Sequence, residues 1–134
     1  MSTANVAIVR GQIESFNRRD SDAMAADWHP EGIWEPASVA PVERRVYVGP
    51  DGIRTFMDDF AATWEEYRLD YEEFVDLGEH VLALGRIEVR HRDSQRLISQ
   101  PHAMLYEFRD GRIVRLRSYL DRAEARKAAV AIAP

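Results

Sequence analysis

The sequence predicts an α+β fold in which N-terminal helices lie on one face of a curved antiparallel sheet. Two observations predict it. Apolar residues recur at helical spacing in the first half of the chain, and runs of strand-forming residues separated by turn residues fill the second half. Helices followed by strands are typical of α+β domains. A length of 134 residues suits one domain, so we expect residues 1–134 to form a single unit.

Three helices are expected before the main sheet. The first spans residues 5–18, where apolar residues recur at steps of three, four and three: Val6, Val9, Ile13 and Phe16. A short second helix follows the cap-type residues 20–22 and ends before Pro30, since the residue before a proline avoids helical geometry. The third begins at residues 49–51, and its apolar spacing extends it over Ile53, Phe56, Phe60, Trp64 and Tyr67.

Strands are expected throughout the rest of the chain. Two short ones are predicted at 32–36 and 45–48, and longer ones at 71–77, 81–91, 97–108 and 113–120. Asp110-Gly111 is a strong hairpin signal between the last two, so the last three strands form an antiparallel meander. Asp121 and Glu124 have the spacing of a capping box, which predicts a final alanine-rich helix.

Composition excludes several classes of partner and site. A net charge of −5 makes nucleic acid and anionic membranes poor partners, so neither is expected. No apolar run reaches the roughly 18 residues of a membrane helix, and the N-terminus lacks the pattern of a secretory signal, so we expect a cytoplasmic protein. The chain has no cysteine, which excludes disulfides, thiolate metal sites and cysteine nucleophiles.

Motifs for metals and nucleotide cofactors are also missing. His80 and His91 lie near opposite ends of one predicted strand, about 36 Å apart at roughly 3.3 Å per residue, so they cannot share an ion. The sequence contains no His-Glu-x-x-His, P-loop or Gly-x-Gly-x-x-Gly motif. We therefore expect no metal and no cofactor, and chemistry limited to carboxylates, histidines, tyrosines and hydroxyls.

Several motifs resemble the SnoaL-like branch of the nuclear transport factor 2-like superfamily, whose fold is shared by ketosteroid isomerase. They are WHPEGIWEP at 28–36, YVGPDGI at 47–53, WEEYR at 64–68, EEFVDLG at 72–78, FRDGRIVR at 108–115 and YLDRAEA at 119–125. The resemblance implies a cone-shaped, cystatin-like roll, with a strongly curved antiparallel or mixed sheet wrapped on the N-terminal helices. It also implies a homodimer that pairs through the outer sheet face, here offering Ile113, Arg115, Arg117 and Tyr119.

The resemblance also allows the isomerase chemistry to be tested against these residues. The overlay puts Gln12 where ketosteroid isomerase has a tyrosine, and it puts either Glu35 or Pro36 at the position of the base. The second oxyanion donor falls on Met104, which cannot donate a hydrogen bond. We therefore predict that the protein is not a ketosteroid isomerase.

Two residues remain as catalytic candidates. The overlay turns His102 into the cone, where an imidazole can act as acid, base or hydrogen-bond donor, the alternative being a structural histidine. Glu35 would be a base if it faced the cavity, but if Trp34 points inward, Glu35 points out. The candidate ligand-binding residues are Gln12, Trp34, Tyr47, Phe60, Gln100, Met104, Tyr106, Leu116 and Ser118.

Two questions stay open at this point. The overlay places Arg86 and Glu88 inside the cone, whereas burial of their apolar neighbours sends both charges to solvent. The function is either that of a small-molecule protein or that of a non-catalytic binding or dimerisation module. The first would perform cofactor-independent acid–base chemistry, of the isomerase, cyclase or hydrolase type, on an apolar or polyketide-like compound. In the second, Trp34, Met104 and Tyr106 would close the cavity.

Overall fold

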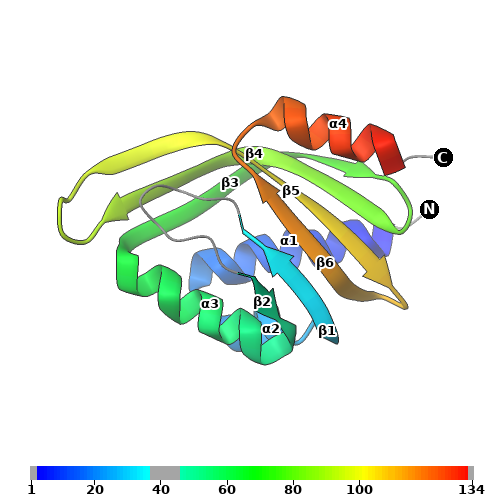
Figure 1. The fold of residues 1–134 in the computed structure, drawn as a ribbon, viewed down its shortest axis with the longest axis horizontal. Helices are drawn as coiled ribbons and strands as arrows, with labels where there is room; N and C mark the ends of the chain where they lie inside the picture. Colours follow the sequence, from blue (N-terminus) through cyan, green and yellow to red (C-terminus); the bar gives the residue numbers. More distant parts are fainter. Residues whose placement is uncertain (1–2, 37–45, 133–134) are drawn as a thin grey trace.

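The computed structural model describes residues 3–36 and 46–132, and it has the predicted α+β architecture. The helices are α1 (Thr3–Arg18), α2 (Ser21–Ala25), α3 (Gly49–Thr63) and α4 (Arg122–Ile132). The strands are β1 (Trp28–Glu35), β2 (Tyr47–Val48), β3 (Trp64–Asp76), β4 (His80–His91), β5 (Leu97–Arg109) and β6 (Arg112–Tyr119). They form one curved sheet in the order β2-β1-β6-β5-β4-β3 (Figure 1). Because β1 runs parallel to β6 while the other neighbours are antiparallel, the sheet is mixed.

Helices cover both faces of this sheet (Figure 1). The N-terminal helices pack on the concave face, where their apolar side chains join alternate residues of the strands in the main core. On the opposite face, α4 packs Ala125 and Ala129 against a second apolar cluster made by Leu82, Leu84, Ala103 and Leu105. The centre of β4 and β5 is therefore buried on both sides, which explains its nearly continuous apolar sequence.

The C-terminus of α1 has the hydrogen bonds of a common helix-ending motif, but an arginine occupies the position that usually holds a glycine. Arg19 N–H donates to the Phe16 carbonyl and Asp20 N–H donates to the Ser15 carbonyl, which is the pairing of a Schellman motif. Arg19 occupies the left-handed position with φ of 61°, where glycine is the usual residue. Asp20 then caps α2 by accepting from the Ala23 N–H at 3.0 Å.

The prediction that α3 extends over Trp64 and Tyr67 is wrong. The helix ends at Thr63, and Trp64 is already extended, with φ of −109° and ψ of 123°. A register shift between Trp64 and Glu66 adds one residue to β3, so Trp64 and Tyr67 are both buried although they are three residues apart. The bulge in β3 thus separates two buried residues by three positions, which is also the spacing of buried residues in a helix.

The structure also answers the question of register in the β4–β5 hairpin. Ile87 and Val89 are buried, while Arg86 and Glu88 are exposed. His102 lies opposite Gly85, so the overlay that turned Arg86 toward His102 is wrong. Burial of the apolar residues decided the register, since a buried charge without a partner is unfavourable.

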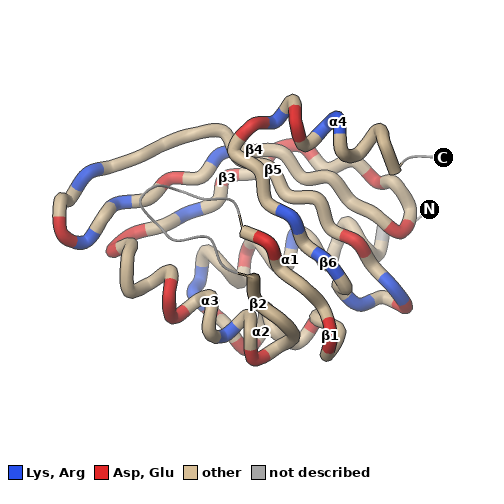
Figure 2. Tube along the Cα trace, viewed as in Figure 1, with Lys and Arg blue, Asp and Glu red and all other residues tan. Residues whose placement is uncertain are grey.

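Ile113 does not lie on the outer face of β6, as the strict alternation of the strand had predicted. It is fully buried in the main core, whereas Arg115 is half-buried and pairs with Glu35. A register shift between Glu107 and Phe108 interrupts the alternation just before this point. Figure 2 shows the basic positions of β6 beside the acidic end of β1.

Candidate functional site

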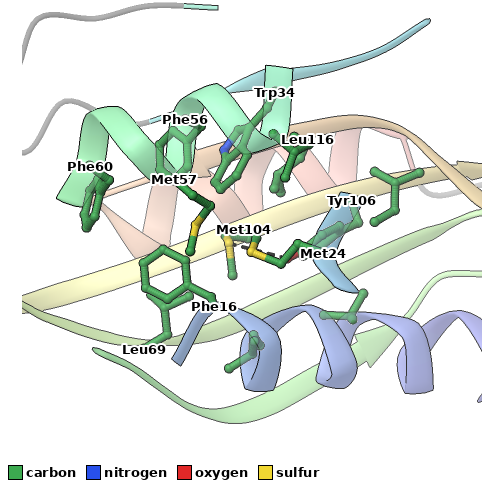
Figure 3. Packing of buried hydrophobic residues seen from close by; sticks show 14 of the residues in the cluster. Phe16, Met24, Trp34, Phe56, Met57, Phe60, Leu69, Met104, Tyr106 and Leu116 are labelled. Carbon is green, nitrogen blue, oxygen red and sulfur yellow. Dashed lines mark hydrogen bonds between the residues drawn. The ribbon is translucent and has the colours of Figure 1, made fainter. Parts of the chain in front are cut away.

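Methionine and aromatic side chains fill the space between the concave face and the helices (Figure 3). Met24 of α2, Met57 of α3 and Met104 of β5 point toward one another in its centre. Trp34 of β1 packs on Phe56 of α3, with 3.9 Å between ring centroids. Thioethers are flexible and polarisable, so this interior can adjust its shape more readily than one of branched aliphatic residues.

Several polar groups at the edges of this interior are bonded to one another. The Trp34 indole N–H donates to Ser118 Oγ at 3.2 Å, and the Tyr106 hydroxyl donates to Met104 Sδ at 3.6 Å. The Tyr47 hydroxyl donates to Asp59 Oδ2 at 2.8 Å. These contacts come from sequence candidates on β1, β2, β5 and β6, and they satisfy buried donors within the protein.

Gln12 has a structural environment at the other side of the interior. Its Nε2 donates to the Met24 carbonyl at 2.9 Å and to Asp27 Oδ2 at 3.0 Å, while its Oε1 accepts from the Trp28 indole at 3.1 Å. Both ends of the amide are therefore engaged in joining α1 to α2 and β1. Both Nε2 protons are taken, so a ligand could use Gln12 only through the second lone pair of Oε1.

A hydrogen bond joins His102 on β5 to Tyr71 on β3 on the concave face. The distance from Tyr71 Oη to His102 Nδ1 is 2.5 Å. Gly85 on β4 pairs with Tyr71 on one side and with His102 on the other. A Cβ at Gly85 would come within 2.3 Å of the Asp70 carbonyl oxygen and 2.8 Å of Tyr71 Cδ1. The absence of a side chain at Gly85 therefore allows the tyrosine to cross β4.

Burial sets the charge state of this pair. It lowers the pKa of His102 to about 4, and it raises the pKa of Tyr71 well above its usual value, with a smaller contribution from Tyr106. At neutral pH the imidazole and the phenol are both uncharged. Because a buried phenol needs an acceptor and Nδ1 is within reach, we assign the Tyr71 hydroxyl as the donor. The remaining imidazole proton then lies on Nε2, which has no hydrogen-bond partner among the residues that the structure describes.

Glu35 is not brought near His102. Its carboxylate accepts from Arg115 Nε at 2.9 Å. Trp34 is buried among the core residues, so by strand alternation the next side chain, Glu35, lies on the other face of β1.

The remaining candidate ligand-binding residues are spread through the core and are not gathered around His102. Phe60, Leu116 and Ser118 are buried, and Gln100 is half-buried opposite Ile87.

Tyr71 was missed as a site residue, because nothing in its local sequence separates it from an ordinary strand tyrosine. The available signal was Gly85, a glycine inside a strand, which marks close approach of another chain segment.

Residues 3–36 and 46–132, which the structure describes, contain no group of three or more histidine or acidic residues able to hold a metal ion. None of the helices in these ranges combines the length and apolarity needed to cross a membrane.

Comparison with known proteins identifies relatives of this fold. An NTF2-like protein of unknown function from Burkholderia pseudomallei K96243 is 26% identical, with a TM-score of 0.80 over 93% of this chain and 96% of that one. TerC, co-crystallised with polyporic acid, is 20% identical, with a TM-score of 0.78 over 93% and 97% of the chains. A putative SnoaL-like polyketide cyclase from Shewanella denitrificans OS-217 is 14% identical, with a TM-score of 0.72 over 96% and 98%.

No curated protein matches the chain. The model of the SnoaL-like domain family, in contrast, matches residues 9–116, which is most of the sequence. That range begins within α1 and ends within β6, so it contains the concave face and both members of the Tyr71–His102 pair. The chain belongs to the SnoaL-like domain family.

Proposed function

We propose that the protein binds a small, largely apolar molecule on the concave face of its sheet and that the His102–Tyr71 pair is the polar anchor of this site. The observation that carries the proposal is the buried, uncharged imidazole of His102, with Nδ1 bonded to Tyr71 and Nε2 unpartnered among the described residues. Such a donor in an apolar surrounding is the usual polar element of a ligand site.

The charge state of His102 specifies the role of the imidazole. With a pKa near 4 it is a weak base at neutral pH, so its contribution is to donate the Nε2 proton in a hydrogen bond to a ligand oxygen. A ligand carbonyl oxygen that gains negative charge would be stabilised by this donor. In cofactor-independent chemistry of the isomerase, cyclase or hydrolase type, His102 would therefore supply oxyanion stabilisation rather than accept a proton.

A polyketide-like compound is the class of ligand that we propose. Two structural relatives support it: one is described as a putative SnoaL-like polyketide cyclase, and TerC was co-crystallised with polyporic acid. The methionine-rich interior also supports it, since Met24, Met57 and Met104 can change rotamer to admit a flat apolar body.

The test uses polyporic acid as the probe and fluorescence of the three tryptophans as the readout. We expect saturable quenching, and we expect His102→Ala to weaken binding by at least about tenfold, which is about 1.4 kcal/mol. Ser99→Ala, an exposed position on the same strand, is the matched control and should bind as the unmodified protein does. Equal affinity of the His102→Ala variant and the control would contradict the proposal.

A specific observation favours a second candidate, a non-catalytic binding or dimerisation module. Trp34, Met104 and Tyr106 are each 4% exposed or less and occupy the interior themselves. Glu35, the other proposed proton carrier, is paired on the opposite face. A protein that binds polyporic acid through His102 and leaves the compound chemically unchanged, as followed by mass spectrometry, would favour this candidate.

We also propose a homodimer through the outer face of β2, β1 and β6, because α4 covers the outer face of β4 and β5 instead. Ile33 and Val48 are cross-strand partners and are 38% and 55% exposed. On β6, Arg115 lies opposite Ile33 and Arg117 lies opposite Glu35. Light scattering should give about twice the 15.4 kDa of one chain, and Val48→Glu should give the monomer mass. A monomer mass for the unmodified protein would overturn this part of the proposal.

A further inference from the structure

Tyr106 has an unusually weak hydrogen-bond partner for a buried tyrosine. Its side chain is 2% exposed, and its hydroxyl donates to Met104 Sδ at 3.6 Å (Figure 3). A thioether is a weak acceptor, whereas the hydroxyls of Tyr71 and Tyr47 donate to an imidazole nitrogen and a carboxylate oxygen. Within the part of the chain that the structure describes, the Tyr106 hydroxyl has no other hydrogen-bond partner. It is therefore a buried donor that would gain by exchanging sulfur for oxygen.

Tyr106 lies on the same face of β5 as His102, with Met104 between them. The three side chains alternate with residues of the apolar cluster on the outer face. The Cα atoms of His102 and Tyr106 are about 13 Å apart along the strand. Burial is the main cause of the raised pKa of Tyr71, and Tyr106 adds to it, so the two phenols are close enough to interact. A second polar group thus lies beside the His102–Tyr71 pair.

The Met104 side chain occupies the space between these two donors. It points toward Met24 and Met57, and all three are unbranched thioethers that change rotamer readily (Figure 3). A ligand that displaces Met104 would lie between His102 and Tyr106. The Tyr106 hydroxyl would then be buried without an acceptor unless the ligand supplied one, and a buried donor without an acceptor is unfavourable. The site would therefore disfavour an apolar ligand of the same shape that lacks an oxygen at this end.

We propose that Tyr106 is a second hydrogen-bond donor to the ligand and that the ligand carries oxygen atoms on opposite sides of an apolar ring, one for His102 and one for Tyr106. This inference rests on the proposed function, since it places the ligand on the concave face. Tyr106 determines specificity, because its hydroxyl favours ring compounds with carbonyl or hydroxyl oxygens on both sides over hydrocarbons. Met104 accepts from Tyr106 while the site is empty.

The probes are 1,4-naphthoquinone and naphthalene, which share a ring system and differ in the two carbonyl oxygens. The readout is the NMR shift of ¹³C-labelled methionine methyl groups, since Met24, Met57 and Met104 lie in the interior. The chain has no cysteine, so the quinone meets no thiol. We expect saturable shifts with both probes and tighter binding of the quinone. Tyr106→Phe should weaken quinone binding by about fivefold, while naphthalene binding is kept or strengthened.

Tyr119→Phe is the matched control, because it removes the hydroxyl of a tyrosine that packs on the outer cluster. This variant should bind both probes as the unmodified protein does. Unchanged quinone binding in Tyr106→Phe, or an equal loss for the quinone and naphthalene, would overturn this inference. The proposed function would survive that result if His102→Ala still weakened quinone binding. Failure of both probes to bind the unmodified protein would overturn the inference and the proposed function together.

Discussion

Tyr71 and His102 lie on strands that are not neighbours, and their hydrogen bond crosses β4 above Gly85. The pair therefore depends on a glycine that itself carries no functional group. A register shift between Tyr71 and Glu73 lies directly beside this contact.

Gly85→Ala should destabilise the protein and separate the pair. The new Cβ would lie 2.3 Å from a backbone oxygen of β3, so the strand has to move. We expect a loss of about 1–3 kcal/mol in urea unfolding, the range for overpacking a core. Gly11→Ala is the control: a Cβ there meets nothing within 4 Å, and alanine in α1 should stabilise the helix by up to about 1 kcal/mol. Equal effects of the two substitutions would contradict this account of Gly85.

Stability should fall as the pH is lowered through the range set by His102. The folded-state pKa is about 4 and the unfolded one about 6.5, so the unfolded chain binds the proton first. The stability that the protein gains by keeping His102 uncharged is fully present above pH 6.5. It is lost progressively between pH 6.5 and 4, and the total loss in the free energy of unfolding is about 3 kcal/mol. His102→Gln should remove this part of the pH dependence, measured as the difference between two series of urea titrations. Parallel pH profiles for the two proteins would show that His102 is protonated as readily as a solvent-exposed histidine.

Tyr71→Phe should remove the donor to Nδ1 and leave a buried acceptor unsatisfied. We expect a loss of about 1–2 kcal/mol in the free energy of unfolding. The ¹⁵N chemical shifts of the imidazole give a second readout, since the tyrosine favours the tautomer with the proton on Nε2. We expect that tautomer to predominate in the unmodified protein and to lose population in the variant. An unchanged tautomer ratio would argue against the assigned direction of the hydrogen bond.

Glu35→Gln should have little effect on ligand binding. The carboxylate pairs with a half-exposed arginine on the outer face, and such pairs contribute about 0–1 kcal/mol. Polyporic acid should therefore bind the variant with the affinity of the unmodified protein, while the unfolding free energy changes by less than about 1 kcal/mol. A tenfold loss of affinity would show that Glu35 takes part in ligand binding after all.

Much of the fold could be predicted from local patterns. The apolar spacing of α1 and the Asp110-Gly111 turn each act within a few residues, and both were located correctly. Asp121 also caps the last helix as predicted, by accepting from the Ala123 N–H at 2.8 Å. The end of α3 was missed because the bulge in β3 places Trp64 and Tyr67 three residues apart, a spacing that helices share.

The site could be predicted only in part, because its geometry is not local. The overlay on the family fold, together with the alternation of β5, placed His102 on the concave face. Its partner Tyr71 is 31 residues away and reaches it only because Gly85 lacks a side chain. The pairing of Glu35 with Arg115 joins strands 80 residues apart and depends on the parallel contact of β1 with β6, which the chain order alone does not reveal.

The packing of α4 on the outer face places this helix where a label can detect ligand binding on the concave face. Leu84 and Ala103, which contact that helix, are chain neighbours of Gly85 and His102 in the same two strands. A ligand on the concave face that moves β4 and β5 would also move α4, because only the backbone of these strands separates the two. A spin label or fluorophore at exposed Val130 would register such an event without touching the occupant.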